Sequence, residues 1–524
     1  MPVRTRFWLI ALLVLALAAL PYVVAWTMTP EGYHYAGVGY NTLDCGSYLA
    51  KMRLGWLGEW RFRLMFTPEP QKGAYLFLYY LALGHEARAL HLPLVMVYHL
   101  ARLINGLLLM AALWWLSKQL TQDDRYHPWG FWFALAGGGI GWALPLIAEN
   151  TVDLWVPEAY GFYSILANAH FPLAQALMVA VFGLTAVWQS GTDRPGYVLS
   201  ALVLTLIVLG IVQPFALATV GLTWLLFLLV QTLTLRRIPW QAGTTLGVAG
   251  GVGLLYPLYA MWATWQDPIL AGWNAQNLTP SPPWWNWAVG YGIILPFAVV
   301  GVVTAWKRRR AVDRIVLVWL AATLLGIALP ITLQRRLSLG LSLPVGMLAG
   351  LGWREADLRL RRWKTAARGV LVVLTATTPL LLVVGGIVGV RSLNLKDLMY
   401  VSVGEVQAGQ EWLDHPSDDV FLASPARGNL IPWLTGRQVV VGHPMETVDF
   451  ARRSEEAKSF FDGAWDSAEQ RAFLCREGVD AIWVGPVERE LHGGDPFRLE
   501  GTALVLENGD VSVYKVKEVC SNGD

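Results

Sequence analysis

Residues 7–26, FWLIALLVLALAALPYVVAW, decide the fold class of this chain, because they form an apolar run without a single charged side chain. About 20 apolar residues in a helix, at about 1.5 Å per residue, are long enough to cross the hydrocarbon core of a bilayer. Arg4 and Arg6 precede the run, as they would in a signal peptide, but the apolar core of a signal peptide is shorter. We therefore expect a retained first membrane span.

The composition of the whole chain agrees with a membrane protein. Of its 524 residues 55% are hydrophobic and only 15% are charged, and the mean hydropathy is +0.43. A soluble domain of this length carries more charge. The net charge of +2 does not indicate a nucleic-acid partner, because the basic residues cluster in loops between apolar runs. Three cysteines are too few and too distant for a disulfide framework or a zinc site, although a pair can form in an oxidising compartment: Cys45, Cys475 and Cys520.

Ten further apolar runs predict an α-helical polytopic membrane protein with about eleven transmembrane helices. The stretch 197–233 is nearly continuous and is divided only near residues 212–216, and the run 338–352 is short enough to be re-entrant or tilted. The ten runs are 94–117, 129–148, 170–189, 197–213, 215–233, 241–262, 286–305, 315–334, 338–352 and 369–390.

The distribution of Lys and Arg supports this count, because basic residues concentrate in cytoplasmic loops. Loops 149–169 and 263–285 contain no Lys or Arg, whereas the loops that alternate with them are basic. This pattern predicts a multi-pass protein of the inner (plasma) membrane, with a cytoplasmic N-terminus and a C-terminus outside the cytoplasm. Arg335 and Arg336 are the exception, because they fall on the predicted outer side.

The composition changes after Val390, where charged residues and turn dipeptides become common. Short runs of strand type alternate with amphipathic runs, which is typical of an α/β domain. We therefore predict a membrane domain over 1–390, which includes a long first outer loop at 28–93, and an extracytoplasmic α/β domain over 391–524. The predicted strands are 419–424, 438–442, 479–485 and 502–507, and the predicted helices lie within 399–415, 446–463 and 466–478.

The first outer loop contains two segments that are too short to span the membrane. Residues 39–60, GYNTLDCGSYLAKMRLGWLGEW, place Tyr48, Met52 and Trp56 on one face, which predicts a helix lying on the membrane surface. Residues 73–84, GAYLFLYYLALG, predict a second interfacial or half-inserted helix.

These segments carry a resemblance to a known family. An acidic residue, Asp44, soon after the first span, a surface helix ending in LGEW, and an apolar helix before the second span resemble the start of the GT-C superfamily. Its members are integral-membrane glycosyltransferases that use polyprenyl-phosphate-linked sugars, and the closest likeness is to the bacterial mannosyl-, arabinosyl- and aminoarabinosyltransferase-like branch. The resemblance covers the first 120 residues, and the remainder mainly by span count and the outward C-terminal domain.

The resemblance implies transfer of a sugar from a polyprenyl-phosphate carrier to a lipid or glycan acceptor at the outer face. In that superfamily the first outer loop supplies an acidic residue that acts as general base or orients the acceptor, and Asp44 matches it. A carboxylate can take the proton that an attacking hydroxyl must lose. Asp44 could instead only cap a helix that begins near Ser47.

In such a reaction Arg335 and Arg336 are candidates for binding the lipid phosphate. Guanidinium groups bind phosphate oxygens in a bidentate manner and would stabilise the phosphate as it leaves. They could also be interface anchors whose charged ends reach the lipid headgroups.

A second group of polar residues occurs in the loop 149–172. The loop contains no Lys or Arg to neutralise its acidic side chains. Such side chains could hold a divalent cation such as Mg or Mn, or position the acceptor. The candidates are Glu149, Asp153, Glu158 and His170. A solvated polar loop is the alternative.

In the C-terminal domain, polar residues at predicted strand ends suggest a docking surface rather than a catalytic site: Ser424, Asn429, Arg437, His443 and Glu446.

Two other classes of function remain open from the sequence, a transporter or flippase of lipid-linked intermediates and a non-catalytic scaffold that binds envelope polymers. Transporters place ionisable residues near the middle of the membrane, at broken helices. Here the ionisable residues fall in loops at the outer edge, which favours an enzyme. No P-loop and no G-x-G-x-x-G occurs in the chain, so a nucleotide-sugar donor is not expected.

Overall fold

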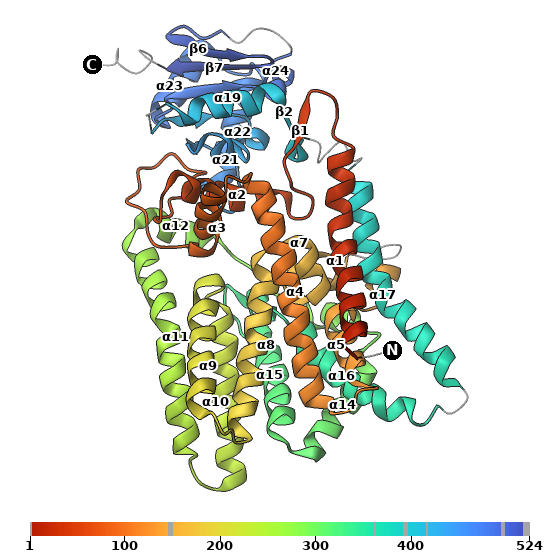
Figure 1. Cartoon of the computed structure of the whole chain (residues 1–524). Helices are drawn as coiled ribbons and strands as arrows, with labels where there is room; N and C mark the ends of the chain where they lie inside the picture. The colour runs from red at the N-terminus through yellow and green to blue at the C-terminus, as the bar shows by residue number, and fades with distance from the viewer. Residues whose placement is uncertain are drawn as a thin grey trace. The chain divides into compact units, whose positions relative to one another are not determined.

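The computed structural model describes residues 3–144, 150–360, 363–390, 397–415, 418–493 and 498–516 (Figure 1). Two residues singled out from the sequence, Glu149 and Cys520, lie outside these ranges. The chain divides into two compact units, which we call the helical unit and the α/β unit. The helical unit comprises Met1–Leu20, His99–Tyr259 and Leu278–Gly385, and the α/β unit comprises Pro21–Tyr98, Ala260–Asn277 and Gly386–Asp524.

Eight helices within the described ranges are long and apolar enough to cross a membrane, so the chain is a multi-pass membrane protein. A ninth span is possible if α13 (Trp284–Gly290) and α14 (Leu295–Arg308), which meet at 93°, form one broken crossing. The eight are α1 (Val3–Thr27), α4 (Leu94–Thr121), α8 (His170–Gln189), α9 (Pro195–Val212), α10 (Ala216–Leu235), α11 (Trp240–Gln266), α15 (Ala311–Ala328) and α17 (Lys364–Gly389).

Two of the eleven predicted spans are shorter helices. α5 (His127–Ala136) has 10 residues and α16 (Ser342–Asp357) has 16. α16 packs closely between α5 and α14, since a Cβ on Gly350 would lie 2.3 Å from Cα of Gly130 and one on Gly352 would lie 1.9 Å from the carbonyl oxygen of Phe297. Such close packing uses small residues, as in membrane helix pairs. Hydropathy alone does not distinguish a helix buried in protein from one that crosses lipid.

The basic loops of the helical unit gather at one end of it. Arg308 and Arg310, at the connection between α14 and α15, both donate hydrogen bonds to the carbonyl oxygen of Leu120 near the end of α4. Arg335 and Arg336 belong to the 3-10 helix η3 (Gln334–Ser338), which follows the opposite end of α15. The separation of these two arginines from the basic loops agrees with the sequence analysis, and which end faces the cytoplasm stays a prediction.

The α/β unit contains a five-stranded mixed sheet of order β4-β3-β5-β7-β6. β3 pairs in parallel with β4 and β5, and β7 pairs antiparallel with β5 and β6. The sequence predicted four of these strands and missed β7. The strands are β3 (Val420–Leu422), β4 (Gln438–Val439), β5 (Ala481–Val484), β6 (Thr502–Asn508) and β7 (Val511–Val516).

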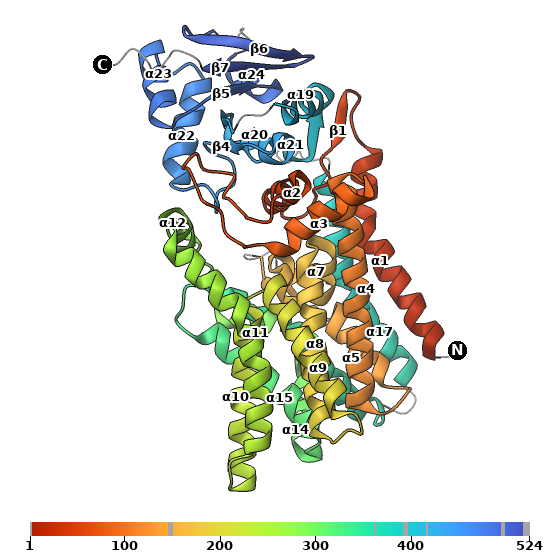
Figure 2. The same cartoon turned by 60° about the vertical axis from the view of Figure 1, so that its left-hand side comes forward.

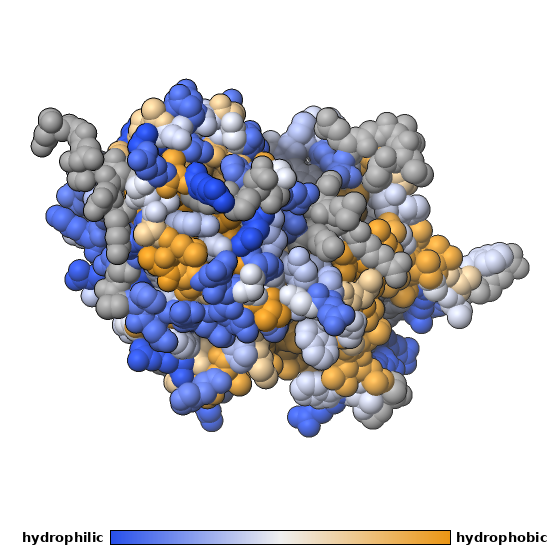
Figure 3. Space-filling model, turned by 90° about the horizontal axis from the view of Figure 1, so that it is seen from above, coloured by the Kyte–Doolittle hydropathy of each residue, from blue (hydrophilic) through white to orange (hydrophobic). Residues whose placement is uncertain are grey.

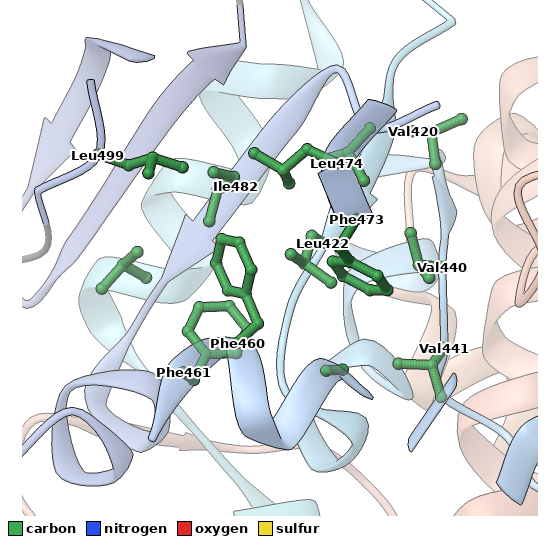
Figure 4. Packing of buried hydrophobic residues seen from close by; sticks show 13 residues of the cluster. Val420, Leu422, Val440, Val441, Phe460, Phe461, Phe473, Leu474, Ile482 and Leu499 are labelled. Carbon is green, nitrogen blue, oxygen red and sulfur yellow. The ribbon is translucent and has the colours of Figure 1, made fainter. Parts of the chain in front are cut away.

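The core of this domain lies between the sheet and two helices, α22 (Phe450–Phe461) and α23 (Ser467–Arg476). Figure 4 shows the rings of Phe460 and Phe473 near Ile482 and Leu422, and all four side chains are buried. Burial of an aromatic side chain contributes roughly 1.5–3 kcal/mol. Hydrophilic residues with smaller apolar patches between them cover much of the face seen from above (Figure 3), as expected for a domain in water.

The first outer loop belongs to the α/β unit by its contacts. Its strand β1 (Tyr33–Tyr35) pairs antiparallel with β2 (Tyr400–Ser402) beyond the last membrane helix. Three short helices of the C-terminal segment complete this part: α19 (Val403–Leu413), α20 (Pro425–Gly428) and α21 (Ile431–Thr435). The composition instead predicts that the loop 28–93 belongs with the membrane helices.

The loop also forms two helices that lie side by side, α2 (Thr42–Leu57) and α3 (Leu78–Leu90) (Figure 2). α2 is not a surface helix, because residues all around it are buried, from Cys45 to Gly55. α3 starts later than predicted, after Phe77, whose φ of 51° interrupts the helix. At the crossing, a Cβ on Gly84 would lie 1.9 Å from the carbonyl oxygen of Met52.

This close crossing predicts a specific loss of stability. Gly84→Ala places a methyl group against the backbone of α2, and overpacking of this kind costs about 1–3 kcal/mol. The control is Gly272→Ala in α12 (Pro268–Gln276), where an added Cβ meets nothing within 4 Å. We expect a lower thermal unfolding midpoint in detergent for Gly84→Ala only, and equal midpoints for the two variants would contradict the packing.

Candidate functional site

Asp44 lies in the first turn of α2. The helix begins at Thr42 and its N-cap is Asn41, which has φ 48° and no side-chain capping bond. Asp44 is therefore the third residue of the helix and is not the cap of a helix starting near Ser47, which corrects that alternative. Its carboxylate still gains from the positive end of the helix dipole.

The carboxylate of Asp44 pairs with an imidazole from the C-terminal domain. Nε2 of His443 lies 3.1 Å from Oδ1 of Asp44. The backbone N–H of Met445 donates to Nδ1 of His443 at 3.1 Å, so the neutral ring carries its proton on Nε2 and donates it to Asp44. The side chain of His443 is 4% exposed and that of Asp44 is 46% exposed. A fixed donor thus holds one oxygen of a carboxylate that remains open to solvent.

His443 belongs to a turn, residues 442–447, that we call the His443 turn. The Gly442 N–H donates to Oγ1 of Thr447 at 3.1 Å, and the Thr447 N–H donates to the carbonyl oxygen of His443 at 2.8 Å. A Cβ on Gly442 would lie 2.5 Å from the carbonyl oxygen of Gly428, so a larger residue does not fit there. The conformation of the turn is therefore fixed by its own hydrogen bonds and by close backbone packing.

The His443 turn is attached to α2 by a buried ion pair. Nζ of Lys51 lies 2.7 Å from Oε1 of Glu446, and Oγ of Ser47 donates to the same oxygen at 2.5 Å. Lys51 also donates to Ser47, and its side chain is 1% exposed. Asp44, Ser47 and Lys51 are spaced i, i+3 and i+7, so they share one face of α2. This face meets His443 and Glu446 of the turn.

The surroundings of Lys51 compensate for its burial. Nζ of Lys51 lies 4.6 Å from the ring centroid of Phe77 and 5.3 Å from that of Phe62. Burial by itself raises the pKa of Glu446, but the charge of the Lys51 ammonium and the hydrogen bonds from Lys51 and Ser47 outweigh it and hold that pKa below its usual value. Because the folded-state pKa is depressed, the ionised carboxylate stabilises the fold above pH 4.5 and loses this contribution as the pH falls further.

Further polar contacts fasten the rest of the first outer loop to the C-terminal domain. Arg453 of α22 donates to Glu69 at 2.6 Å and to Oγ1 of Thr67 at 2.8 Å, and it pairs with Glu477 at 3.0 Å. Gln276 of α12 donates to the carbonyl oxygen of Thr447 at 2.9 Å. The His443 turn is therefore held by two elements, α2 and α12.

Arg335 and Glu158, both singled out from the sequence, meet in the helical unit. Nε of Arg335 lies 3.2 Å from Oε1 of Glu158, and its guanidinium lies 5.1 Å from the ring centroid of Trp155. Burial raises the pKa of Glu158, and Arg335 opposes this shift. The Arg336 guanidinium lies 4.8 Å from the ring centroid of Phe215. Arg335 thus already has a carboxylate partner, which a phosphate would have to share or replace.

The other candidates of the loop 149–172, Asp153 and His170, make contacts that do not involve Arg335 or Glu158. Asp153 accepts hydrogen bonds from Thr151 at 2.5 Å and Thr378 at 3.1 Å, and burial raises its pKa. His170 is the first residue of α8, and its ring lies 4.2 Å from that of Phe171. Glu149 lies outside the described residues.

The described ranges contain no group of three or more His, Cys, Asp or Glu side chains that could hold a metal ion.

Of the predicted site residues, the structure joins Arg335 to Glu158 within the helical unit, and it joins Asp44 to His443 within the α/β unit. The convergence of Asp44 with the arginine pair stays a prediction. Sequence reasoning missed Ser47 and Lys51, and it treated His443 and Glu446 only as part of a docking surface. The i, i+3, i+7 spacing of polar residues in an otherwise apolar helix was the available signal.

The buried ion pair predicts a double-mutant coupling. Lys51→Met leaves Glu446 buried without its cation, which costs about 3–5 kcal/mol, and adding Glu446→Leu should restore much of that loss. Lys72→Met, at an exposed position of the same loop, is the control. Thermal unfolding in detergent is measured for the wild type, Lys51→Met, Glu446→Leu, the double variant and the control, and strictly additive losses would show that the two side chains do not interact.

No family model matches the sequence, and no curated protein matches it. Solved structures do match. ArnT from Cupriavidus metallidurans, in a structure bound to undecaprenyl phosphate, is 13% identical over 97% of this chain and 97% of that chain, with a TM-score of 0.53. The Archaeoglobus fulgidus oligosaccharyltransferase is 13% identical over 92% of this chain and 69% of that chain, with a TM-score of 0.52.

The mycobacterial arabinofuranosyltransferase AftD is 14% identical over 96% of this chain, with a TM-score of 0.55, and the match covers 40% of AftD. At these identities the likeness concerns the fold. All three proteins are membrane glycosyltransferases of the superfamily that the first 120 residues resemble. The chain has the fold of the GT-C glycosyltransferases.

Proposed function

We propose that this protein is a membrane glycosyltransferase that moves a sugar from a polyprenyl-phosphate carrier to a lipid or glycan acceptor at the outer face of the membrane. The observation that carries the proposal is the solvent-open carboxylate of Asp44, held by a buried imidazole, at the position where the superfamily places its acidic residue. Neighbours of the same fold, in structures with undecaprenyl phosphate or dolichol phosphate bound, support a polyprenyl-phosphate donor.

In the proposed reaction the acceptor hydroxyl attacks the anomeric carbon of the donor sugar. The bond to the phosphate oxygen breaks, and the lipid phosphate leaves with the electron pair. Oδ2 of Asp44 takes the hydroxyl proton, because Oδ1 is already bonded to His443. Arg335 and Arg336 would neutralise the charge that develops on the phosphate. Release of Arg335 from Glu158 would then accompany binding of the donor.

A flippase or a passive scaffold would need no proton acceptor. The geometry around Asp44 favours an enzyme, because a half-exposed carboxylate that is fixed by a buried donor is poised for proton transfer. A carboxylate that served only a surface contact would contribute little to stability and would not require such a fixed partner.

The base role of Asp44 predicts loss of turnover on a conservative change. The assay uses proteoliposomes with a panel of radiolabelled undecaprenyl-phosphate-linked pentoses and hexoses, and bacterial envelope lipids as acceptors. Asp44→Asn should lower the rate of transfer about 10²–10⁴-fold, the range for loss of a general base. Glu31→Gln, an exposed acid in the same loop, should behave as wild type. Normal turnover by Asp44→Asn would remove this residue from the mechanism.

The phosphate role of Arg335 predicts a loss of donor affinity. Arg335→Ala removes one charge-assisted contact, so binding of undecaprenyl phosphate should weaken about tenfold or more, as expected for about 1.5–3 kcal/mol. Arg236→Ala, exposed at the end of α10 in a basic loop, is the matched control. Microscale thermophoresis in detergent gives both affinities, and equal values would argue against a phosphate site at Arg335.

A further inference from the structure

We propose that His443, in the C-terminal domain, is the positioning residue for the catalytic carboxylate: its Nε2–H fixes Oδ1 of Asp44 and directs Oδ2 to the acceptor. This inference rests on the proposed function and deepens it, because it makes the C-terminal domain a part of the active site. The interaction joins residues that are 399 positions apart in the chain.

The imidazole is held in one orientation and one tautomer. The Met445 N–H donates to Nδ1, so the proton of the neutral ring lies on Nε2, where it points at Asp44. The ring also lies 5.8 Å from that of Phe66, and its side chain is 4% exposed. A donor fixed in this way restricts the orientation of the Asp44 carboxylate, whose side chain is 46% exposed.

The turn that carries His443 is anchored by further contacts of its own. The Lys51–Glu446 pair joins the His443 turn to α2 on the same helical face as Asp44, at 2.7 Å in a buried setting. Gln276 of α12 also donates a hydrogen bond to the carbonyl oxygen of Thr447. Because catalytic groups lose about 100-fold in rate when misplaced by 1 Å, a rigid support of this kind is what an orienting residue requires.

A purely structural role makes a different prediction. If His443 only filled space beside Phe66, a phenyl ring would replace it well and an amide would not. If it positions Asp44, the donor is required: Gln can supply an N–H near the place of Nε2, and Phe cannot. The ionisable groups that face the imidazole are Asp44 and Glu446, with Lys51 beside Glu446, and all three are unchanged in both variants.

The first experiment compares His443→Phe and His443→Gln with wild type in the proteoliposome assay, using the donor and acceptor that turn over. We expect His443→Phe to lower kcat about 10- to 100-fold with KM nearly unchanged, and His443→Gln to recover most of it. The acid limb of the rate profile should move up by about one pH unit in His443→Phe, because one hydrogen bond to the charged form is lost. An equal loss for both variants at every pH, without that movement, would overturn the positioning role.

The second experiment does not depend on turnover. A carbodiimide reacts with the protonated carboxyl group, so the pH dependence of Asp44 labelling, read by peptide mass spectrometry on the full chain, reports the same hydrogen bond. The labelling midpoint should rise by about one pH unit in His443→Phe and stay near wild type in His443→Gln. An unchanged midpoint in His443→Phe overturns the inference. A further outcome is that the midpoint shifts in His443→Phe while the wild-type protein transfers no sugar from any donor of the panel. That outcome supports the contact between His443 and Asp44 and refutes the proposed function.

Discussion

Lys51 places an ammonium group in the interior of the α/β unit, and its pairing with Glu446 is the constraint on which the rest of the candidate site depends. An unpaired charge at that depth would cost several kcal/mol, so α2 and the His443 turn are stable only when they are together. Ser47 and two aromatic rings complete the surroundings of the ammonium. The position of His443 relative to Asp44 follows from this pairing, because all four side chains lie on the same two elements.

The same logic applies to the whole first outer loop, which polar contacts attach to the C-terminal domain. β1 pairs with β2, and Arg453 binds Thr67, Glu69 and Glu477. Backbone groups of a long loop need hydrogen-bond partners when they are buried, and a partner domain can supply them. The loop and the C-terminal domain therefore form one structural unit, even though the segments that connect them in sequence are membrane helices.

In the helical unit, two short helices are held by close packing against their neighbours. α5 and α16 are too short to count as spans, yet they are buried through contacts at Gly130, Gly350 and Gly352. Small residues allow helix backbones to approach one another, which stabilises association where the surrounding lipid offers no hydrophobic driving force. η3, with Arg335 and Arg336, is a short 3-10 helix beyond the end of α15, where an ion pair to Glu158 and a cation–π contact to Trp155 hold Arg335.

The sequence by itself determined the fold class, eight of the membrane helices and most strands of the C-terminal sheet, because hydropathy and periodicity are local properties. Only the tertiary structure decided that α2 is buried, that its helix begins at Thr42, and that Asp44, Ser47 and Lys51 face His443 and Glu446. The spacing of Asp44, Ser47 and Lys51 marks a polar face on α2, but nothing in the sequence identifies the partner of that face, which lies nearly 400 residues away. These pairs are identified only in the folded structure, where the buried Lys51 lies next to the carboxylate that neutralises it.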